Sequence, residues 1–398
     1  MLGGAPGRSG YAGLLSTPSP SAPPDPLPGR STTDVLVVGG GPIGLAIAWR
    51  ARARGLTVTL CERGGLPSYL SAAHVAAGML APVAEADPQE LALLGLGLDS
   101  AARWAAFAGE LGEASGLEVG YRDCGTLVVA RDRDEAEHVD REIRLREQLG
   151  VPVARLLPSA ARRLEPALAP AIRAAFHAPD DHAVDPRTVC EALLIACELA
   201  GVHLRPGCEV AAVDGDGVRL ASGEHVPAGQ VVIAAGAWAP RIEGLPCLPV
   251  RPVKGQVLRL AARAGEGHLL EHVVRWDGGY LVPRGDGRVI LGATMEDRGY
   301  DTTVTALGVY ELLRDAGELV PGVLELDLEA AVAGLRPATP DNAPLLGAWE
   351  GVTLACGHHR NGILLTPVTA DRITALLLGE DAGIDPAFAP GRFARQPA

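Results

Sequence analysis

The chain has 398 residues, of which 47% are apolar and 4% aromatic, and its net charge is −13. This length exceeds what one simple core supports, so two closely associated domains are expected. The negative charge argues against a nucleic-acid or anionic-membrane partner, because no basic surplus is left to neutralise phosphates.

The seven cysteines are scattered along the chain and form no Cys-x-x-Cys pair. Their odd number and spacing argue against a disulfide framework and against a zinc site, so we expect no metal and a reducing, cytoplasmic environment. No apolar run approaches the roughly 18–20 residues that span a bilayer, and we therefore expect no membrane partner.

Residues 1–33 differ in composition from the rest of the chain, with proline, serine and glycine dominating 17–31. An export signal would need an apolar stretch of about 7–15 residues after its basic start, and none follows here. We interpret the segment as a disordered leader or as the product of a misassigned start codon.

The first regular elements are typical of a βαβ unit. Residues 34–38 form a short β-branched run that ends in glycines, as in a buried parallel strand. Residues 42–54 are predicted to be helical, and Gly55 suits the C-terminal end of that helix. A second strand is predicted over residues 57–62.

The later elements alternate between helices and groups of strands. In chain order we predict a helix over 88–115, a strand over 125–131, and helices over 133–149 and 186–200. Residues 209–220 and 224–235 resemble a hairpin that turns at 214–217 and closes on an apolar strand. Strands over 250–260, 272–276, 280–283 and 289–293, a helix over 304–317, a strand over 352–355 and a helix over 364–378 follow. This order predicts an α/β fold in which a Rossmann-like nucleotide-binding domain is interleaved with an antiparallel-sheet α+β substrate domain. The expected ranges are 34–86, 176–243 and 336–398 for the first domain, and 87–175 and 244–335 for the second.

A glycine fingerprint, Gly39-x-Gly41-x-x-Gly44, lies between the first predicted strand and helix. The first glycine permits a tight turn, the second lets the backbone approach a pyrophosphate, and the third lets helix and strand pack closely. The helix N-terminus then offers free N–H groups and partial positive charge to the phosphates. Glu62 ends the next strand about 20 residues on, where a carboxylate can bind ribose hydroxyls.

The fingerprint alone leaves FAD and NAD open, although Glu62 disfavours NADP because it would repel the 2′-phosphate. Two later segments favour a buried flavin. The run over 231–238 brings a strand to the small residues Ala235 and Gly236 before Trp238, which allows close approach to an extended cofactor. The segment 357–363 precedes a helix, whose N-terminus would stabilise the negative charge of a reduced flavin.

Five segments, in order, carry a family resemblance: residues 76–80 (AAGML), 279–284 (GYLVPR), 291–296 (LGATME), 333–337 (AGLRP) and 357–365 (GHHRNGILL). On these the chain resembles the D-amino-acid oxidase superfamily of flavoproteins and, within it, the bacterial glycine oxidases of thiamine biosynthesis. The resemblance covers residues 34 to about 380.

The resemblance implies a substrate site. Arg336 would bind the substrate carboxylate, which suits the planar two-donor fork of a guanidinium. Tyr280 would donate its hydroxyl to the same carboxylate, and Arg360 would lie beside both flavin and substrate. Met295 would form a pocket wall, although an ordinary core methionine fits the sequence nearly as well. Tyr280, Arg336 and Arg360 are therefore the predicted catalytic residues, and Met295 joins them in substrate binding.

The resemblance also implies a noncovalent FAD site, since no cysteine stands where related sarcosine oxidases attach flavin. The expected cofactor contacts are Gly39, Gly41, Pro42, Ile43, Gly44, Glu62, Arg63, Ala72, Ala73, Ala77, Gly78, Met79, Val210, Ala235, Gly236, Trp238, His358, His359, Arg360, Asn361, Gly362, Ile363 and Leu364. The sequence departs from the usual family pattern at two places. Ala72 and Ala73 replace a common pair of hydroxyl residues, so one or two cofactor hydrogen bonds are expected to be lost or to move to Ser71. His359 replaces an aromatic residue.

The activity that the resemblance implies is oxidation of a small amino acid by FAD and oxygen, giving the imine, ammonia and hydrogen peroxide. For glycine the product is glyoxylate, and a thiazole synthase is a candidate acceptor of the imine. The sequence leaves open a D-amino-acid or sarcosine oxidase of the same fold, a dehydrogenase with another acceptor, an NAD-dependent dehydrogenase, a non-enzymatic flavin-binding protein and homo-oligomerisation.

Overall fold

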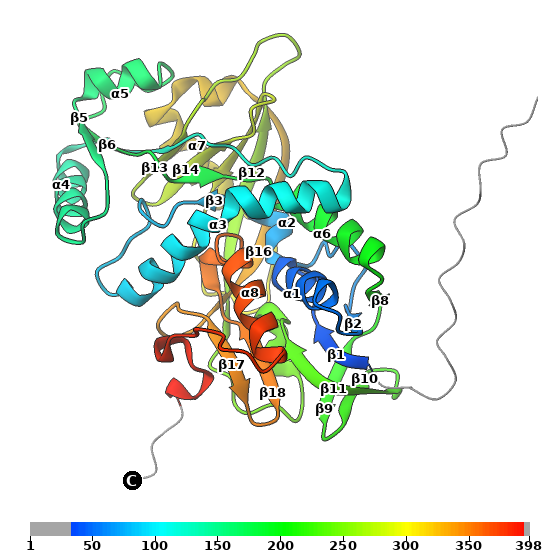
Figure 1. The fold of residues 1–398 in the computed structure, drawn as a ribbon. Coiled ribbons are helices and arrows are strands. Elements are labelled where there is room, and N and C mark those ends of the chain that lie inside the picture. The colour runs from blue at the N-terminus through cyan, green and yellow to red at the C-terminus, as the bar shows by residue number, and fades with distance from the viewer. Residues whose placement is uncertain (1–32, 394–398) are drawn as a thin grey trace, which may run out of the picture. The chain divides into compact units, whose positions relative to one another are not determined.

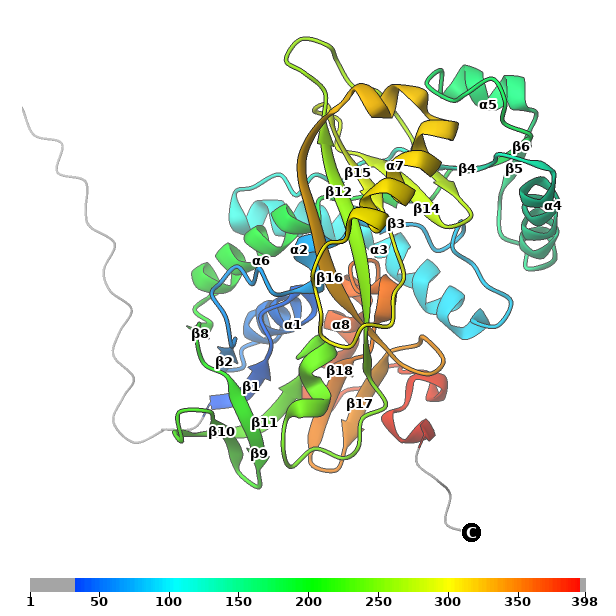
Figure 2. The same cartoon turned by 180° about the vertical axis from the view of Figure 1, so that it is seen from behind.

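The computed structural model describes residues 33–393 (Figures 1 and 2). The interpretation of residues 1–33 as a leader therefore lies outside the described residues, apart from Thr33, which begins the first strand.

The helices are α1 (Pro42–Ala53), α2 (Ala72–Val75), α3 (Leu91–Ser115), α4 (Arg133–Gln148), α5 (Pro158–Leu164), α6 (Pro186–Ala200), α7 (Ala306–Leu319) and α8 (Thr366–Leu377), with 3-10 turns η1 (Gly236–Arg241), η2 (Pro321–Glu325), η3 (His359–Asn361), η4 (Pro386–Phe388) and η5 (Pro390–Phe393). The strands are β1 (Thr33–Val38), β2 (Val58–Cys61), β3 (Met79–Leu80), β4 (Thr126–Ala130), β5 (Ala154–Leu156), β6 (Ala174–Ala178), β7 (His182–Ala183), β8 (His203–Arg205), β9 (Val210–Asp214), β10 (Gly217–Leu220), β11 (His225–Ile233), β12 (Arg251–Ala261), β13 (Val273–Trp276), β14 (Gly279–Pro283), β15 (Arg288–Gly292), β16 (Asp327–Ala338), β17 (Leu345–Trp349) and β18 (Val352–Cys356).

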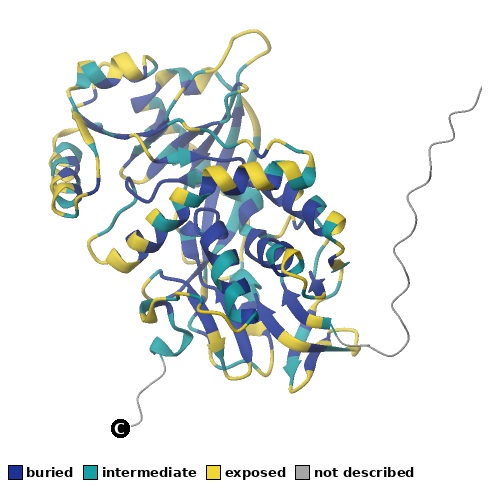
Figure 3. Cartoon of the chain, in the orientation of Figure 1, coloured by how far each residue is buried: buried dark blue, intermediate teal, exposed yellow. Residues whose placement is uncertain are grey.

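The first sheet has the order β17-β18-β11-β1-β2-β8, and β9 and β10 continue it as an antiparallel meander from β11. Strand β1 lies between two parallel neighbours, β2 and β11, and is buried on both faces. Because side chains alternate along a strand, Val35 and Val37 pack among α1, α6 and α8, whereas Leu36 and Val38 pack toward β9 and β10. This layering explains why the β1 sequence is a continuous apolar run (Figure 3).

The chain leaves β1 toward β2 on one side and returns to β11 on the other. Such a reversal is a topological switch point, and ligands of open α/β sheets bind outside the carboxyl ends of the strands there. The glycine fingerprint follows β1 directly at this point, so the fold places it where a nucleotide site is expected.

The second sheet has the order β16-β12-β15-β14-β13-β4-β6-β5 and is antiparallel except for the β13–β4 pair. Helix α7 covers one face, where Leu312 and Leu319 pack with Leu281 and Leu291. The other face carries Val257, Val282 and Ile290, which pack with Ala77 from the region predicted as the first domain. This second face therefore looks onto the loop expected to pass the flavin.

The predicted α/β fold with an interleaved antiparallel sheet is confirmed. The hairpin predicted to turn at 214–217 is confirmed, because β9 and β10 pair antiparallel with Asp214 opposite Gly217. The sequence did not single out β5, β6, β7, β8, β16 or β17. The domain boundaries stay a prediction, and α3, on the substrate side of the proposed boundary near 87, packs against α6 and α8.

The sequence led us to expect no apolar run long enough to span a bilayer, and helix α3 bears on that expectation. Among residues 33–393 it alone is long and apolar enough to cross a bilayer by length and composition. It also carries the buried side chains Trp104, Phe107 and Leu111, which belong to the core shared with α1 and α6. A core helix of this kind passes the same test.

Gly44→Ala should lower the free energy of unfolding by about 1–3 kcal/mol, because a Cβ at Gly44 would lie 1.9 Å from the Gly39 carbonyl oxygen. The matched control is Gly95→Ala in α3, where a Cβ meets nothing within 4 Å. Chemical denaturation should show the loss for Gly44→Ala alone. Equal stability of the two variants would contradict the packing role of Gly44.

Candidate active site

A single cavity of about 1680 Å³ runs from the end of β1 to the second sheet. Ordinary small-molecule sites occupy about 300–1,000 Å³, so this cavity has room for an extended cofactor together with a substrate. Of the predicted site residues, all line it except Gly44, Asn361 and Leu364. Gly44 packs on Gly39, and Asn361 and Leu364 are buried beside α8.

The glycine turn closes one end of the cavity. Gly39 has a φ of 115°, and a Cβ there would lie 2.5 Å from the Ala234 carbonyl oxygen at the end of β11. Gly41 is the N-cap of α1 and contributes no side-chain cap. The first-turn N–H groups of α1 are thus free of a side-chain cap and lie along the cavity, as binding of a pyrophosphate requires.

Glu62 lies at the end of β2 and organises this turn. Its Oε2 accepts a hydrogen bond from the Gly40 N–H at 2.7 Å, while Oε1 accepts from the Gly64 N–H at 3.0 Å and the Ser68 hydroxyl at 3.1 Å. The carboxylate therefore holds the glycine loop in addition to lining the cavity, a role that the sequence did not reveal.

Two further residues predicted to bind the cofactor, Arg63 and Trp238, contact each other near Glu62. The Arg63 guanidinium lies 3.7 Å from the centroid of the Trp238 ring. Val210, at the start of β9, also lines this part of the cavity. Their assignment to the ribose and adenine end stays a prediction.

The middle of the cavity is bounded by the turn Ala77–Met79. Gly78 has a φ of 79°, and a Cβ there would lie 2.1 Å from the Val184 carbonyl oxygen. Arg284, directly after β14, donates from Nη2 to the Ala77 carbonyl at 2.7 Å and from Nη1 to the Val184 carbonyl at 3.0 Å. Arg284 is buried, so it ties this turn to the second sheet. Arg284 belongs to the segment 279–284 that carried the family resemblance, but the sequence did not indicate its hydrogen-bond partners.

The approach to α8 places two neutral imidazoles beside the cavity. Burial lowers the pKa of both His358 and His359 to about 3. The His358 Nε2 pairs with the Thr369 hydroxyl at 3.1 Å. The Nδ1 of His359 is buried and has no hydrogen-bond partner among residues 33–393. An uncharged ring with a free nitrogen atom is thereby presented at the cavity wall.

The far end of the cavity holds Tyr280 on β14 and Arg336 on β16. Glycines make room for both: a Cβ at Gly292 would lie 2.6 Å from the Tyr280 ring, and one at Gly255 would lie 2.3 Å from Arg336 Nη1. Arg336 has no carboxylate within 4.0 Å among the described residues. Burial raises the pKa of Tyr280, although Arg336 opposes this, so the phenol stays protonated and can donate a hydrogen bond.

Comparisons with known proteins agree with this geometry. A family model for DAO, FAD dependent oxidoreductase, matches residues 34–376. The chain belongs to this family. It is therefore an FAD-dependent oxidoreductase, and the resemblance predicted from the sequence is confirmed.

Individual relatives place the chain within the family. It is 36% identical to a glycine oxidase of Geobacillus kaustophilus over 88% of this chain and 94% of the relative. The crystal structure of glycine oxidase from that organism matches with a TM-score of 0.85 and 34% identity, covering 92% of this chain and all of the other. The bifunctional protein ThiO/ThiG of Trichormus variabilis is 36% identical over 92% of this chain, but the chain spans only 55% of that protein.

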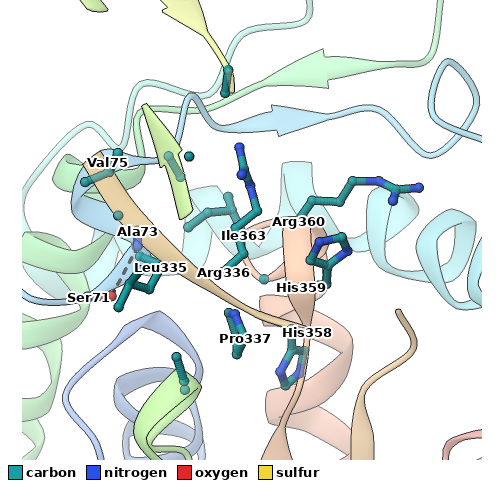
Figure 4. Close-up of a pocket in the computed structure, with 18 of the residues that line it drawn as sticks. Ser71, Ala73, Val75, Leu335, Arg336, Pro337, His358, His359, Arg360 and Ile363 are labelled. Carbon is teal, nitrogen blue, oxygen red and sulfur yellow. Dashed lines mark hydrogen bonds between the residues drawn. The ribbon is translucent and has the colours of Figure 1, made fainter. Parts of the chain in front are cut away.

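The residues of this FAD-dependent oxidoreductase fit the cofactor of its family. The backbone cradle at Gly39 and the uncapped start of α1 suit the pyrophosphate. Ala72 and Ala73 line the cavity without hydroxyl groups, but the Ser71 hydroxyl, which caps Ala73 N–H at 3.2 Å, lies beside Gly41 (Figure 4). A hydrogen bond from Ser71 to the cofactor stays a prediction.

Arg360 differs from Arg336 in its charge environment. Its Nη2 lies 2.8 Å from Glu90 Oε2 and its Nε 3.7 Å from Glu85 Oε2. Figure 4 shows its side chain running away from β16, which carries Arg336. Arg360 lines the cavity with its guanidinium neutralised by acidic partners that the sequence did not identify. Its catalytic role stays a prediction.

Met295 is 66% exposed and lines the cavity. The alternative interpretation as a core methionine is therefore wrong, because a core side chain would be excluded from solvent. Its contact with a substrate stays a prediction.

Arg284→Lys should weaken FAD binding about tenfold, because an ammonium cannot reproduce the fork that reaches both Ala77 and Val184. The dissociation constant for FAD, measured by titrating apoprotein, checks this. The matched control is Arg288→Lys on the same hairpin, since the Arg288 side chain is 39% exposed and pairs with Asp286 at 2.7 Å. Equal FAD affinity in both variants would rule out the clamp.

Proposed function

We propose that the protein oxidises glycine to the imine, which water converts to glyoxylate and ammonia, with oxygen reduced to hydrogen peroxide. One observation carries the proposal: Arg336, without an acidic partner among the described residues, lies with Tyr280 in the cavity that also holds the dinucleotide turn. A half-buried guanidinium without a counter-charge is costly, and a substrate carboxylate would supply the missing negative charge. The glycine oxidase relatives support the same choice.

The roles of the side chains follow from their chemistry. Arg336 would bind the carboxylate with two parallel N–H groups, and the protonated Tyr280 would add a third donor. This grip fixes the Cα–N bond of the substrate in one orientation, and correct orientation alone contributes about 7–11 kcal/mol in favourable cases. Bound noncovalently, FAD would supply the two-electron oxidant.

No residue is assigned as a general base. His358 and His359 are neutral at physiological pH, and neither is needed to bind the substrate carboxylate. The overall conversion balances as glycine, oxygen and water giving glyoxylate, ammonia and hydrogen peroxide. The amine must enter in its neutral form, because its lone pair drives formation of the imine.

The setting of the reaction is also a proposal. The bifunctional name ThiO/ThiG of a relative supports delivery of the imine to a thiazole synthase in thiamine synthesis. All seven cysteines are free, which supports a reducing cytoplasm. Homo-oligomerisation stays a prediction that light scattering of the purified protein can test.

Reduction of the enzyme-bound flavin by glycine without oxygen tests the function. Glycine should bleach the visible flavin absorbance, and peroxide should form in a one-to-one ratio with glyoxylate once air is admitted. A panel of glycine, sarcosine, D-alanine and D-proline then ranks the substrates. Bleaching by D-alanine or sarcosine but not glycine would favour the related oxidases, and turnover without peroxide would favour a dehydrogenase.

Arg336→Leu should reduce kcat/KM for glycine about a hundredfold or more, mainly by raising KM, because losing one partner of a buried charge pair costs about 3 kcal/mol or more. Steady-state kinetics measures the effect. Arg263→Leu, whose side chain is 63% exposed and pairs with Asp327 away from the cavity lining, is the control and should behave as the parent enzyme. An unchanged KM in Arg336→Leu would remove Arg336 from carboxylate binding.

A further inference from the structure

A buried polar network lies beside Arg336, and the function proposed above gives its residues no role. It joins β12 to the segment between β15 and α7, residues 293–305, which we call the β15–α7 segment. Lys254 and Gln256 of β12 are each 1% exposed and, two residues apart on a strand, point to the same side. Lys254 is the only lysine in the chain.

Glu296 is the centre of this network. Its Oε1 accepts hydrogen bonds from Gln256 Nε2 at 2.6 Å and from the Thr294 hydroxyl at 2.7 Å. Its Oε2 lies 3.5 Å from Lys254 Nζ, and Asp301 Oδ2 approaches the same ammonium at 3.7 Å. Partial burial acts to raise the pKa of Glu296, but the hydrogen bonds and the Lys254 charge hold it below its ordinary value, so the carboxylate is ionised.

The backbone reinforces the same contact. The Lys254 N–H donates to the Glu296 carbonyl at 2.9 Å, and the Glu296 N–H donates to the Lys254 carbonyl at 3.0 Å. The Thr294 hydroxyl also accepts from the Gln256 N–H at 2.9 Å. The start of the β15–α7 segment is therefore fixed against β12 by side chains and main chain together.

This fixed segment touches Arg336 directly. Arg336 Nη1 donates to the Thr294 carbonyl at 3.1 Å and to the Lys254 carbonyl at 3.4 Å. Both acceptors belong to residues of the network. Because a guanidinium is planar, two hydrogen bonds from Nη1 restrict the directions of its remaining N–H groups.

We propose that Glu296 and Lys254 are positioning residues that hold the Arg336 guanidinium in the orientation that receives the substrate carboxylate. The proposal rests on the carboxylate-binding role of Arg336 in the proposed function. Glu296 and Lys254 act as a unit, because removing either charge leaves the other buried with an incomplete partner set. Release of the Thr294 and Lys254 carbonyls then lets Arg336 rotate.

The test uses Glu296→Gln in the full-length, FAD-loaded enzyme. This change keeps the side-chain size but removes the charge that faces Lys254. The KM for glycine should rise about tenfold, while kcat changes less than about twofold and FAD affinity is unchanged. The dissociation constant of glycolate, read from the perturbation of the flavin spectrum, should rise by the same factor as KM.

Glycolate binding needs no turnover, so this measurement separates the two proposals. If glycine fails to reduce the flavin in the parent enzyme, the proposed function fails, yet a weaker glycolate complex in Glu296→Gln still supports the positioning role. Unchanged glycolate binding in Glu296→Gln would overturn the positioning role whatever the substrate.

Two additional variants show whether the effect passes through Arg336. In an Arg336→Leu background, Glu296→Gln should not change glycolate binding further, and an additional loss there would overturn the proposal. Asp297→Asn, on the same segment with an 80% exposed side chain, is the matched control and should match the parent enzyme.

Lys254→Met tests the same proposal independently, because it removes the positive charge that pairs with Glu296. It should raise KM for glycine to a similar extent, and the double variant with Glu296→Gln should be no worse than either single variant. If neither buried variant yields folded enzyme, Asp301→Asn, on a half-exposed carboxylate, should still weaken glycolate about threefold. Unchanged glycolate binding in Asp301→Asn would then overturn the proposal.

Discussion

The close approach of backbone to backbone at the end of β1 is the constraint on which the rest of the site depends. Gly39 lies where a Cβ would meet the Ala234 carbonyl at 2.5 Å, and Gly44 lies where one would meet Gly39 itself at 1.9 Å. The absence of side chains lets β1, α1 and β11 converge at the switch point of the sheet. Glu62 then secures the turn by accepting from the Gly40 N–H. A cofactor can follow the backbone only because this junction is tight.

In the second sheet, glycines also make room for close approach, but here the approaching groups are side chains. Gly255 and Gly292 lie on neighbouring strands, and each leaves the volume that a functional side chain occupies. Arg336 and Tyr280 therefore rest against the sheet, where large neighbours would have displaced them. A rigid antiparallel sheet holds such groups more precisely than a loop would. The dinucleotide turn and the Tyr280–Arg336 end of one cavity are thus built on separate sheets, and Arg284 ties the turn at Ala77 to the second sheet through the Ala77 carbonyl.

Local physics explains which parts could be predicted from the sequence. The unit β1–α1–β2 was predicted because an apolar run, a glycine turn and a small-residue helix lie within about thirty residues of each other. Strand β16 was not singled out, since most of its twelve residues are partly exposed and show no regular alternation. Arg336 was therefore assigned by family resemblance alone. The partners of Arg360 were invisible, because Glu90 is 270 residues away in the chain and only folding brings it within 2.8 Å.

The two arginines at the substrate end show why residue type alone does not define a binding group. Arg360 is satisfied by carboxylates, so its charge is already neutralised. Arg336 is satisfied by the carbonyls of Thr294 and Lys254, which accept its protons without cancelling its charge. Neutral acceptors therefore fix the guanidinium and leave its positive charge for an incoming anion. Lys254 contributes to this arrangement without competing for the anion, since Glu296 and Asp301 hold its ammonium. This arrangement supports the proposal that Arg336 binds the substrate carboxylate.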